Sequence, residues 1–312
     1  MRIVDLFKQI QWKRWPFFLD FRPGCLFSFS LLVYAVYVLS TGTIIHLMQQ
    51  KPIVIFDSGV GGLSIYQEIR EKLPFLSVIY CSDSEGFPYG PKPENDVVDR
   101  TLHCLTRLVE RFQPALAIIA CNTASTISLP KARQLLDIPI VGVVPAIKTA
   151  SQSSQKRCIG LLATPGTIER DYTHQLIHEF AGDCDVIRVG SSELVHLAEQ
   201  HLRGEKINPA DLKKIIKPLF NGNRWPDCIV LGCTHFPLVQ ELLNSVVPAP
   251  VTWIDSGEAI ARRVAALLEV HHAHHEGPVE HRFLYTGSDQ SMTSLLPALK
   301  AMNFSEITCL DT

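Results

Sequence analysis

The sequence is short of two features that would point to particular classes of protein. Lys and Arg number 29 against 31 Asp and Glu, and no long run of one charge occurs, so the bulk charge gives no sign of direct nucleic-acid binding. The nine cysteines are odd in number and contain no C-x-x-C spacing of the metal-binding type. Reduced thiols in a cytoplasmic protein are therefore favoured over disulfides or a zinc site.

Charged residues are also missing from residues 24–48, and basic residues precede this apolar stretch. Hydropathy alone predicts a membrane-spanning helix there, with its basic flank inside. The absence of an A-x-A-like cleavage site disfavours a signal peptide. The other interpretation is a mis-assigned start, with Met48 as the true first residue. We favour it because the fold signals begin abruptly at Pro52. Residues 1–50 are thus an N-terminal extension, with a membrane tether as the alternative.

From residue 51 onward, short β-branched runs alternate with amphipathic segments of helical length. This alternation predicts an α/β fold with mainly parallel sheets flanked by helices. We expect two facing α/β domains with the active site between them, the first made of residues 51–145 and 256–312 and the second of residues 146–255. Strands are expected at residues 53–56, 77–81, 116–120, 140–143, 157–162, 185–188, 228–231, 251–254 and 282–285.

Two finer features of the pattern are also predicted. Residues 94–112 should form a helix that buries one apolar stripe. The stripe consists of Val98, Leu102, Leu105, Val109 and Phe112. Pro130 and Pro145 punctuate the middle of the chain. Pro145 is expected to open a helix directly after a strand, where the chain crosses between the domains.

Two pairs of similar sequences indicate two related halves. Residues 118–123 and 230–235 each combine an apolar strand, a small residue, a cysteine and polar donors. Asp-Ser-Gly follows an apolar strand at both Asp57 and Asp255. Ligands of such sheets bind beyond the carboxyl ends of the strands, which is where all four elements are expected.

Cys121 and Cys233 are the candidate reactive groups of these repeats. Each follows a predicted buried strand, where the amides of the next helix lower a thiol pKa and raise the thiolate fraction. A lone buried cysteine is usually a small core residue. A structural role would have to explain both cysteines, which occupy matching positions and are each followed by polar residues. We therefore interpret both as reactive. The others are interpreted as structural: Cys25, Cys81, Cys104, Cys158, Cys184, Cys228 and Cys309.

The glycine-rich segment 57–63 lacks the Lys-Ser/Thr of a P-loop and the glycine spacing of a dinucleotide site. The Asp57 carboxylate would repel phosphate. It suits a substrate ammonium or a supporting role in proton transfer, while the glycines let backbone amides approach the ligand. A tight turn capped by Asp57 is compatible with this role.

Three further segments carry polar groups of interest. His235 lies beside a candidate thiolate and is interpreted as a proton-relay partner. Glu199 faces the cleft in one interpretation and is an ordinary solvated helix carboxylate in the other. Pro88-Tyr89-Gly90 by itself indicates only a turn. The histidine-rich stretch 271–275 is interpreted as a solvated linker, and no metal is expected there.

Taken together, these motifs resemble the glutamate racemases of peptidoglycan synthesis, within the aspartate/glutamate racemase superfamily. The resemblance covers about residues 52–312 and rests on five ordered motifs. They are Phe56-Asp57-Ser58-Gly59-Val60-Gly61-Gly62-Leu63, Pro88-Tyr89-Gly90, Ala120-Cys121-Asn122-Thr123-Ala124-Ser125, Gly142-Val143-Val144-Pro145-Ala146 and Leu231-Gly232-Cys233-Thr234-His235-Phe236-Pro237.

The resemblance implies a racemisation that needs no cofactor. Cys121 would remove the proton from D-glutamate and Cys233 the proton from L-glutamate, and each thiol would reprotonate the opposite face. Asp57 and His235 would assist the two cysteines. Glu199 falls near a family carboxylate associated with the site. The residues implied to hold the substrate are Asp57, Ser58, Tyr89, Gly90, Asn122, Thr123, Thr234 and His235.

Residues 142–148 and 190–194 look most like the enterobacterial members of this family. In that subset the precursor UDP-N-acetylmuramoyl-L-alanine acts as an activator near the domain hinge. Arg133 and Lys148 are the cationic residues that we expect near its phosphates.

Two other functions fit the same sequence. An aspartate or broad-specificity racemase would use the same thiol pair, and proton-exchange rates for the two amino acids in deuterated water distinguish them. A protein that binds and inhibits DNA gyrase, as some family members are reported to do, is the alternative from another class. It would keep its cellular phenotype after both cysteines are replaced by serine.

Overall fold

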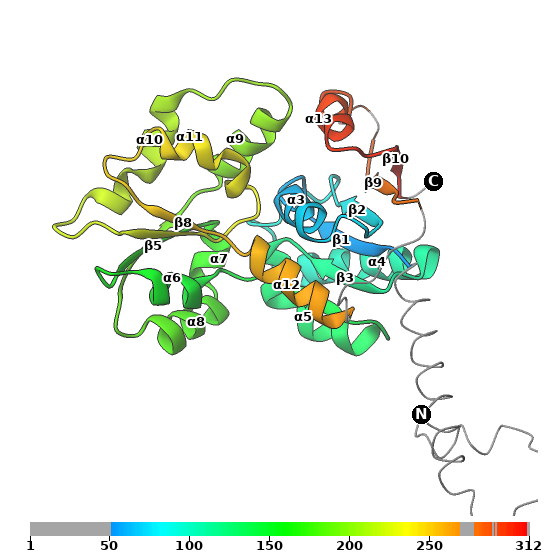
Figure 1. Ribbon diagram of the computed structural model, residues 1–312, viewed down its shortest axis with the longest axis horizontal. Coiled ribbons are helices and arrows are strands. Elements are labelled where there is room, and N and C mark those ends of the chain that lie inside the picture. Colours follow the sequence, from blue (N-terminus) through cyan, green and yellow to red (C-terminus); the bar gives the residue numbers. More distant parts are fainter. Residues whose placement is uncertain (1–50, 269–277, 289, 291, 311–312) are drawn as a thin grey trace, which may run out of the picture. The chain divides into compact units, whose positions relative to one another are not determined.

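The computed structural model describes residues 51–268, 278–288, 290 and 292–310, and these residues build two parallel sheets flanked by helices (Figure 1). The predicted α/β class is therefore confirmed. We call the sheet that contains β1, with its helices, the larger half, and the sheet that contains β5, with its helices, the smaller half. The strands of the larger half come from residues 53–142 and 281–309, and those of the smaller half from residues 158–254.

The larger half has a six-stranded sheet whose strand pairs are all parallel. Its strands, in spatial order, are β10 (Glu306–Cys309), β9 (His281–Tyr285), β2 (Val78–Ser82), β1 (Ile53–Asp57), β3 (Leu116–Ile119) and β4 (Ile140–Gly142). Its helices are α3 (Leu63–Lys72), α4 (Glu94–Phe112), α5 (Asn122–Leu135), α12 (Gly257–Leu267) and α13 (Leu296–Ala301).

The smaller half has a four-stranded parallel sheet. Its strands, in spatial order, are β6 (Asp185–Gly190), β5 (Cys158–Ala163), β7 (Cys228–Leu231) and β8 (Thr252–Ile254). Its helices are α6 (Ile147–Ser153), α7 (Pro165–Glu169), α8 (Asp171–Ala181), α9 (Glu193–Leu202), α10 (Pro209–Ile216), η2 (Lys217–Phe220), η3 (Phe236–Val239) and α11 (Gln240–Asn244).

Strand β1 shows why helices cover both faces of the larger sheet. Successive side chains of a strand point to opposite faces. Ile53 and Ile55 pack with residues of α3 and α12, whereas Val54 and Phe56 pack with residues of α4 and α5. All four are fully buried, as an uninterrupted apolar run in a central parallel strand requires.

The strand order creates a crevice in each sheet. The chain runs from β1 to β2 on one side and then continues as β3 on the other side of β1. It does the same around β5, with β6 on one side and β7 on the other. Such reversals leave room for a ligand at the carboxyl ends of the strands. Cys121 follows β3 and Cys233 follows β7, so the two cysteines occupy equivalent positions in the two sheets.

The chain passes between the halves twice, once after β4 and once after β8. Ser256 lies just beyond β8, and its Oγ donates a hydrogen bond of 2.6 Å to the backbone oxygen of Val144. The two crossing segments are therefore tied to each other. The exact domain limits given in the sequence analysis stay a prediction.

Some local predictions were wrong. In α4 the predicted stripe residues Val98 and Leu105 are buried, but Leu102, Val109 and Phe112 are only half-buried. The rest of the buried face consists of Val97, Thr101, Cys104 and Leu108. Pro130 lies inside α5 instead of interrupting the helical segment. Helix α6 begins at Ile147, two residues after Pro145. Strand β10 was not predicted, and its residues are all half-buried at the edge of the larger sheet.

Two sequence predictions fall on parts of the chain that the structure does not describe. The apolar stretch 24–48 and the histidine-rich stretch 271–275 lie outside the described residues. Within the described residues, no helix combines the length and the apolar character needed to cross a bilayer.

Candidate active site

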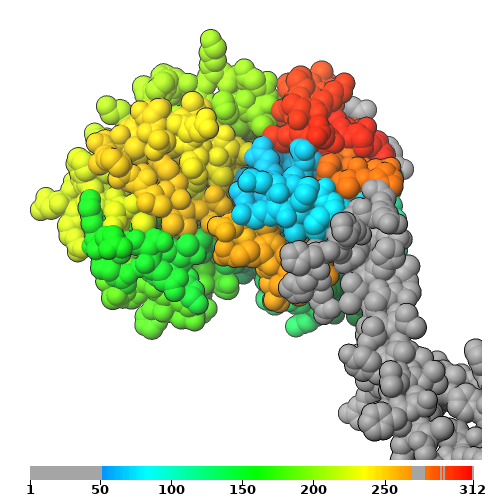
Figure 2. Space-filling view, in the orientation of Figure 1, coloured from blue at the N-terminus to red at the C-terminus, as the bar shows by residue number. Residues whose placement is uncertain are grey.

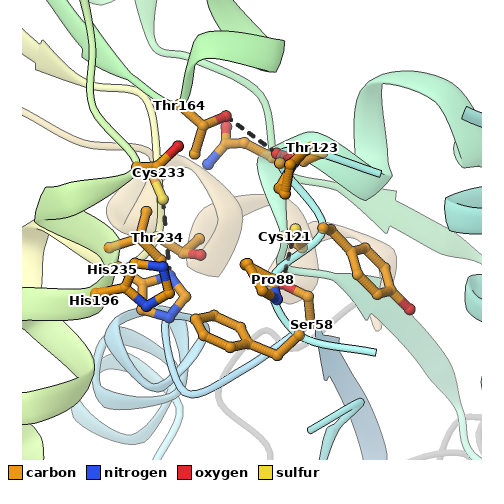
Figure 3. A pocket seen from close by; sticks show the side chains of 16 residues that line it. Ser58, Pro88, Cys121, Thr123, Thr164, His196, Cys233, Thr234 and His235 are labelled. Carbon is orange, nitrogen blue, oxygen red and sulfur yellow. Dashed lines mark hydrogen bonds between the residues drawn. The ribbon is translucent and has the colours of Figure 1, made fainter. Parts of the chain in front are cut away.

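A small cavity lies between the carboxyl ends of the two sheets (Figure 3). Nine of the residues predicted for the site line it, a set that includes both cysteines. The full lining is Ser58, Phe87, Pro88, Tyr89, Gly90, Pro91, Cys121, Asn122, Thr123, Thr164, Ser192, Val195, His196, Cys233, Thr234 and His235. The cavity volume is only about 30 Å³, which is room for about one or two water molecules. On the face shown in Figure 2, atoms of the two halves are in contact.

Cys121 and Cys233 lie on opposite walls of this cavity (Figure 3). Cys121 comes from the larger half, where it is the residue before α5, and Cys233 comes from the smaller half, just before η3. Each is only 7% exposed. The structure therefore brings both cysteines to one cavity, one from each half.

Ser58 and Asp57 flank Cys121. Ser58 Oγ lies 3.4 Å from Cys121 Sγ. Burial raises the pKa of the Cys121 thiol to about 12, and the nearby Asp57 charge adds to the rise, although Ser58 and the amide of Ala124 act in the opposite direction. The predicted lowering of the thiol pKa by the amides of the next helix is therefore wrong for Cys121, because desolvation outweighs them.

Asp57 does not line the cavity but lies fully buried beneath it. Its Oδ1 accepts a hydrogen bond of 2.9 Å from the amide of Gly59, and its Oδ2 accepts one of 3.0 Å from Thr234 Oγ1. Burial raises the pKa of Asp57, and the charge of His235 and these hydrogen bonds only partly offset the rise. Through Thr234, this carboxyl of the larger half contacts the residue next to Cys233 in the smaller half.

A chain of polar side chains leads away from Cys233. Cys233 Sγ lies 3.8 Å from His235 Nδ1, and His235 Nε2 lies 2.9 Å from Glu199 Oε1. The other Glu199 oxygen pairs with Arg203 Nη2 at 3.2 Å. Glu199 is buried, so the interpretation of an ordinary solvated carboxylate is wrong.

The charges in this chain follow from its contacts. Burial acts to lower the pKa of His235, but its contacts with Cys233 and Glu199 outweigh burial and raise that pKa well above its usual value. Burial acts to raise the pKa of Glu199, but the hydrogen bond and charge of His235, the amide of Val60 and the charge of Arg203 together lower it. His235 and Glu199 therefore form a buried pair beside Cys233, in which each partner favours the charged form of the other.

The glycine-rich segment 59–61 allows the two halves to approach closely. A Cβ added at Gly61 would lie 2.4 Å from His235 Nδ1 and 2.7 Å from Thr234 Oγ1. The amide of Val60 donates a hydrogen bond of 3.0 Å to Glu199 Oε1. The absence of side chains at these glycines is thus needed for packing against the opposite half, and not only for the approach of a ligand that the sequence predicted.

Asn122 and Thr123 supply polar groups to the cavity. Asn122 Oδ1 is buried and has no hydrogen-bond partner among the described residues. A buried acceptor without a partner is costly, so an N–H donor of a bound molecule would stabilise it. Thr123 Oγ1 lies 3.3 Å from Thr164 Oγ1 of the smaller half. Within the described part of the chain, no group of His, Cys, Asp and Glu side chains is arranged to hold a metal ion.

Four residues of the site were not predicted from the sequence: Phe87, Thr164 and His196, which line the cavity, and Asp83, which holds its wall. Thr164 directly follows β5, as Asp83 follows β2. The rule that ligands bind beyond the carboxyl ends of parallel strands would have found both. Phe87 and His196 had no comparable signal, because their rings meet only through the fold, with centroids 5.8 Å apart.

Arg133 and Lys148 do not line the cavity. Both are exposed. The guanidinium of Arg133 donates hydrogen bonds of 3.2 and 3.0 Å to the backbone oxygen of Ile140. Lys148 Nζ lies 5.2 Å from the ring centroid of Phe180.

The fold agrees with comparisons to known proteins. The family model of Asp/Glu/Hydantoin racemases matches residues 53–264, and the chain belongs to this family. It is 51% identical over 226 residues to a glutamate racemase of Escherichia coli O139:H28, a match that covers 72% of this chain and 78% of that protein.

Solved structures of relatives have the same fold. The crystal structure of Escherichia coli glutamate racemase in complex with L-glutamate and the activator UDP-MurNAc-Ala matches with a TM-score of 0.79 and 46% identity, covering 83% of this chain and 98% of that chain. A glutamate racemase isoform from Bacillus anthracis matches with a TM-score of 0.71 and 28% identity, covering 84% of this chain and 97% of that chain.

Proposed function

We propose that this chain interconverts L- and D-glutamate by direct proton exchange between its two buried cysteines. The observation that carries the proposal is the position of Cys121 and Cys233 on opposite walls of one cavity, at equivalent points of two parallel sheets. The 51% identity to a glutamate racemase supports the choice of glutamate. The product, D-glutamate, would serve peptidoglycan synthesis.

The reaction balances without an added oxidant or reductant. Starting from L-glutamate, the thiolate of Cys233 takes the α-proton, and the electron pair of the broken C–H bond stays on the α-carbon. The thiol of Cys121 then gives its proton to the opposite face. Cys233 ends as a thiol and Cys121 as a thiolate, and the reverse reaction runs from that state. Because the bases act on opposite faces, the configuration inverts without rotation of the substrate.

The surroundings of each sulfur fit this sequence of steps. Burial keeps the proton on Cys121, which is the form that must donate to the carbanion formed from L-glutamate. The cationic His235, held by Glu199, would stabilise the negative charge on Cys233 sulfur before it takes a proton. The free Oδ1 of Asn122 suits the substrate ammonium. Fixed charges and dipoles in a dry site are what lower the barrier to a carbanion.

The first test is the loss of racemisation in single variants. Cys121→Ser and Cys233→Ser should each reduce racemisation by at least about a thousandfold, because each removes one of two required proton carriers. Circular dichroism of the glutamate pool measures the loss. Wild-type rates in either variant would rule out the two-base mechanism.

Isotope exchange then assigns each sulfur to one enantiomer. L- and D-glutamate have equal free energies, so kcat/KM must be equal in both directions for every variant and cannot give the assignment. In deuterated water, Cys121→Ser should still exchange the α-proton of L-glutamate and Cys233→Ser that of D-glutamate. The opposite pattern would reverse the assignment. The same assay with aspartate tests the alternative substrate.

Activation by UDP-N-acetylmuramoyl-L-alanine is the finer part of the proposal. The solved Escherichia coli relative contains this activator, and Arg133 and Lys148 are exposed cations available for its phosphates. The nucleotide should raise turnover of the wild type and have less effect on Arg133→Ala. Equal rates with and without it would exclude activation. Binding to DNA gyrase and attachment to membranes stay predictions from the sequence.

A further inference from the structure

Asp83 is a buried carboxylate outside the groups assigned to proton transfer. It follows β2 directly, and its amide donates a hydrogen bond of 2.9 Å to the backbone oxygen of Asp57 at the end of β1. Its side chain is 0% exposed. A buried charge destabilises the folded state unless neighbouring groups compensate it with hydrogen bonds or an opposite charge.

Three side chains from separate parts of the larger half compensate this charge. Arg100 of α4 binds both carboxylate oxygens, with Nε at 2.6 Å from Oδ2 and Nη2 at 2.7 Å from Oδ1. Thr286, just after β9, donates to Oδ1 at 2.6 Å. Tyr89 Oη donates to Oδ2 at 2.6 Å. This two-pronged guanidinium contact is among the stronger and more directional interactions in proteins.

The hydrogen-bond balance keeps Asp83 ionised. Burial acts to raise the pKa of Asp83, but the hydrogen bonds from Arg100, Thr286 and Tyr89 outweigh it and lower that pKa. The carboxylate therefore accepts hydrogen bonds only. Tyr89 must donate to it, so the Tyr89 O–H is not available as a donor to a bound substrate.

Asp83 thereby fixes one wall of the cavity. Tyr89, with the adjoining residues 87–91, forms that wall, and Tyr89 itself is only 1% exposed. Gly86 precedes this segment, and a Cβ added there would lie 2.2 Å from Asp83 Oδ2 and 2.3 Å from Arg100 Nε. The amide of Gly86 also donates a hydrogen bond of 3.0 Å to the backbone oxygen of Asp83. The start of the wall and the carboxylate are thus packed as one unit.

We propose that Asp83 is a positioning residue, which sets the affinity for substrate by holding the 87–91 wall through Tyr89. The inference rests on the proposed function, since the molecule that meets this wall is taken to be glutamate. Asp83 acts on the shape of the cavity and takes no part in proton transfer. Its loss therefore affects both enantiomers alike, because the wall is shared by both.

Asp83→Asn and Tyr89→Phe test this role. Asp83→Asn weakens the contacts to Arg100 and the phenol, and the KM for both enantiomers should rise by roughly tenfold or more with a smaller change in kcat. Tyr89→Phe removes only the phenol oxygen and keeps the buried ring, so it should fold and raise KM in the same direction by a smaller factor.

Glu85→Gln is the matched control. Glu85 is the second carboxylate partner of Arg100, at 3.0 Å, but its side chain is 62% exposed and it does not line the cavity. Its replacement should leave KM within about twofold of the wild-type value. KM values unchanged in both Asp83→Asn and Tyr89→Phe, with an active wild type, would overturn the positioning role alone. A wild type that does not racemise glutamate would instead overturn the proposed function.

Discussion

Burial decides the state of the individual groups in this site. Cys121 directly precedes α5, where backbone amides favour a thiolate, yet the pKa of Cys121 rises to about 12 because burial disfavours the charged form of the thiol. Asp57 is in the same position, since burial raises its pKa. The site thus holds two buried acids whose pKa values are raised by burial, next to the buried pair His235–Glu199.

Asp57 should make the stability of the protein depend on pH. A carboxyl whose pKa is raised in the folded state contributes stability below its unfolded pKa of 3.8 and loses it as the pH rises toward the folded pKa. Asp57→Asn does not titrate. The unfolding free energy of this variant relative to wild type should therefore increase from pH 4 to pH 7, by up to about 1.4 kcal/mol per pH unit.

Urea unfolding at the two pH values measures this difference. Asp99→Asn, which removes an exposed carboxylate of α4, is the control. Asp57→Asn should also lose racemase activity, because the carboxyl lies beneath the cavity and contacts Ser58 and Thr234. A difference in stability that is the same at pH 4 and pH 7 would contradict the assignment of a raised pKa to Asp57.

The site residues that could be predicted are those next to strand ends. Cys121, Cys233 and Asp57 each directly follow an apolar run, so local sequence indicates their position. Asp83 has the same local signal, but its importance depends on Arg100 and Thr286, which lie 17 and 203 residues away. Contacts of that kind are set by tertiary packing, which local patterns do not encode. The pKa of Cys121 could not be predicted for the same reason, since it depends on how completely the two halves exclude water.

The turn between β1 and α3 requires a glycine at position 61. A Cβ at Gly61 would overlap His235 Nδ1 and Thr234 Oγ1 of the smaller half. Gly61→Ala should therefore displace His235 and lower kcat/KM by roughly tenfold to a hundredfold, equally in both directions.

Gly222→Ala is the matched comparison for this turn. The nearest atom to a Cβ at Gly222 is 3.8 Å away, so this variant should keep wild-type kinetics. Steady-state rates for both enantiomers, with thermal unfolding to confirm that each variant folds, give the result. If Gly61→Ala and the wild type have equal kcat/KM values, the turn can accommodate a Cβ without displacing His235, and the prediction is wrong.

Most strands could be predicted from the sequence because they are buried and consist almost entirely of apolar residues. Strands β1, β3, β5 and β7 are fully buried and, apart from Asp57 at the end of β1, contain no charged residue, so their runs are clear in the sequence. Strand β10 is half-buried at an edge and has no such run. The α4 stripe was displaced because Thr101 and Cys104 face the core, where Thr101 Oγ1 donates to the backbone oxygen of Val97 at 2.7 Å. A hydroxyl that donates a hydrogen bond to a backbone oxygen of its own helix can be buried, and a hydropathy pattern does not predict its burial.

The cavity between the two halves is smaller than the proposed substrate. Because about 30 Å³ is too little room for an amino acid, we expect the two halves to move apart when glutamate enters. Arg170 of the smaller half holds them together at α5. Its Nη1 donates to the backbone oxygen of Thr123 at 3.0 Å, and its Nε lies 3.4 Å from Glu94 Oε1.

Arg170→Ala should weaken the closed form. The Arg170 side chain is only 10% exposed, and its loss leaves the Thr123 carbonyl without this donor, so KM should rise by roughly tenfold for both enantiomers. Arg188→Ala, which removes an exposed arginine of β6, is the control and should change KM little. The closing role of Arg170 fails if both variants have the same KM.

The order of the strands also bears on synthesis in the cell. β2 pairs with β9, yet every strand of the smaller half lies between them in the sequence. While a ribosome makes the chain, β2 therefore remains an open edge until the smaller half has been completed, and an open edge can pair with other chains. The nascent larger half should consequently depend on chaperones for longer than the smaller half, although the first strands of the larger half emerge earlier.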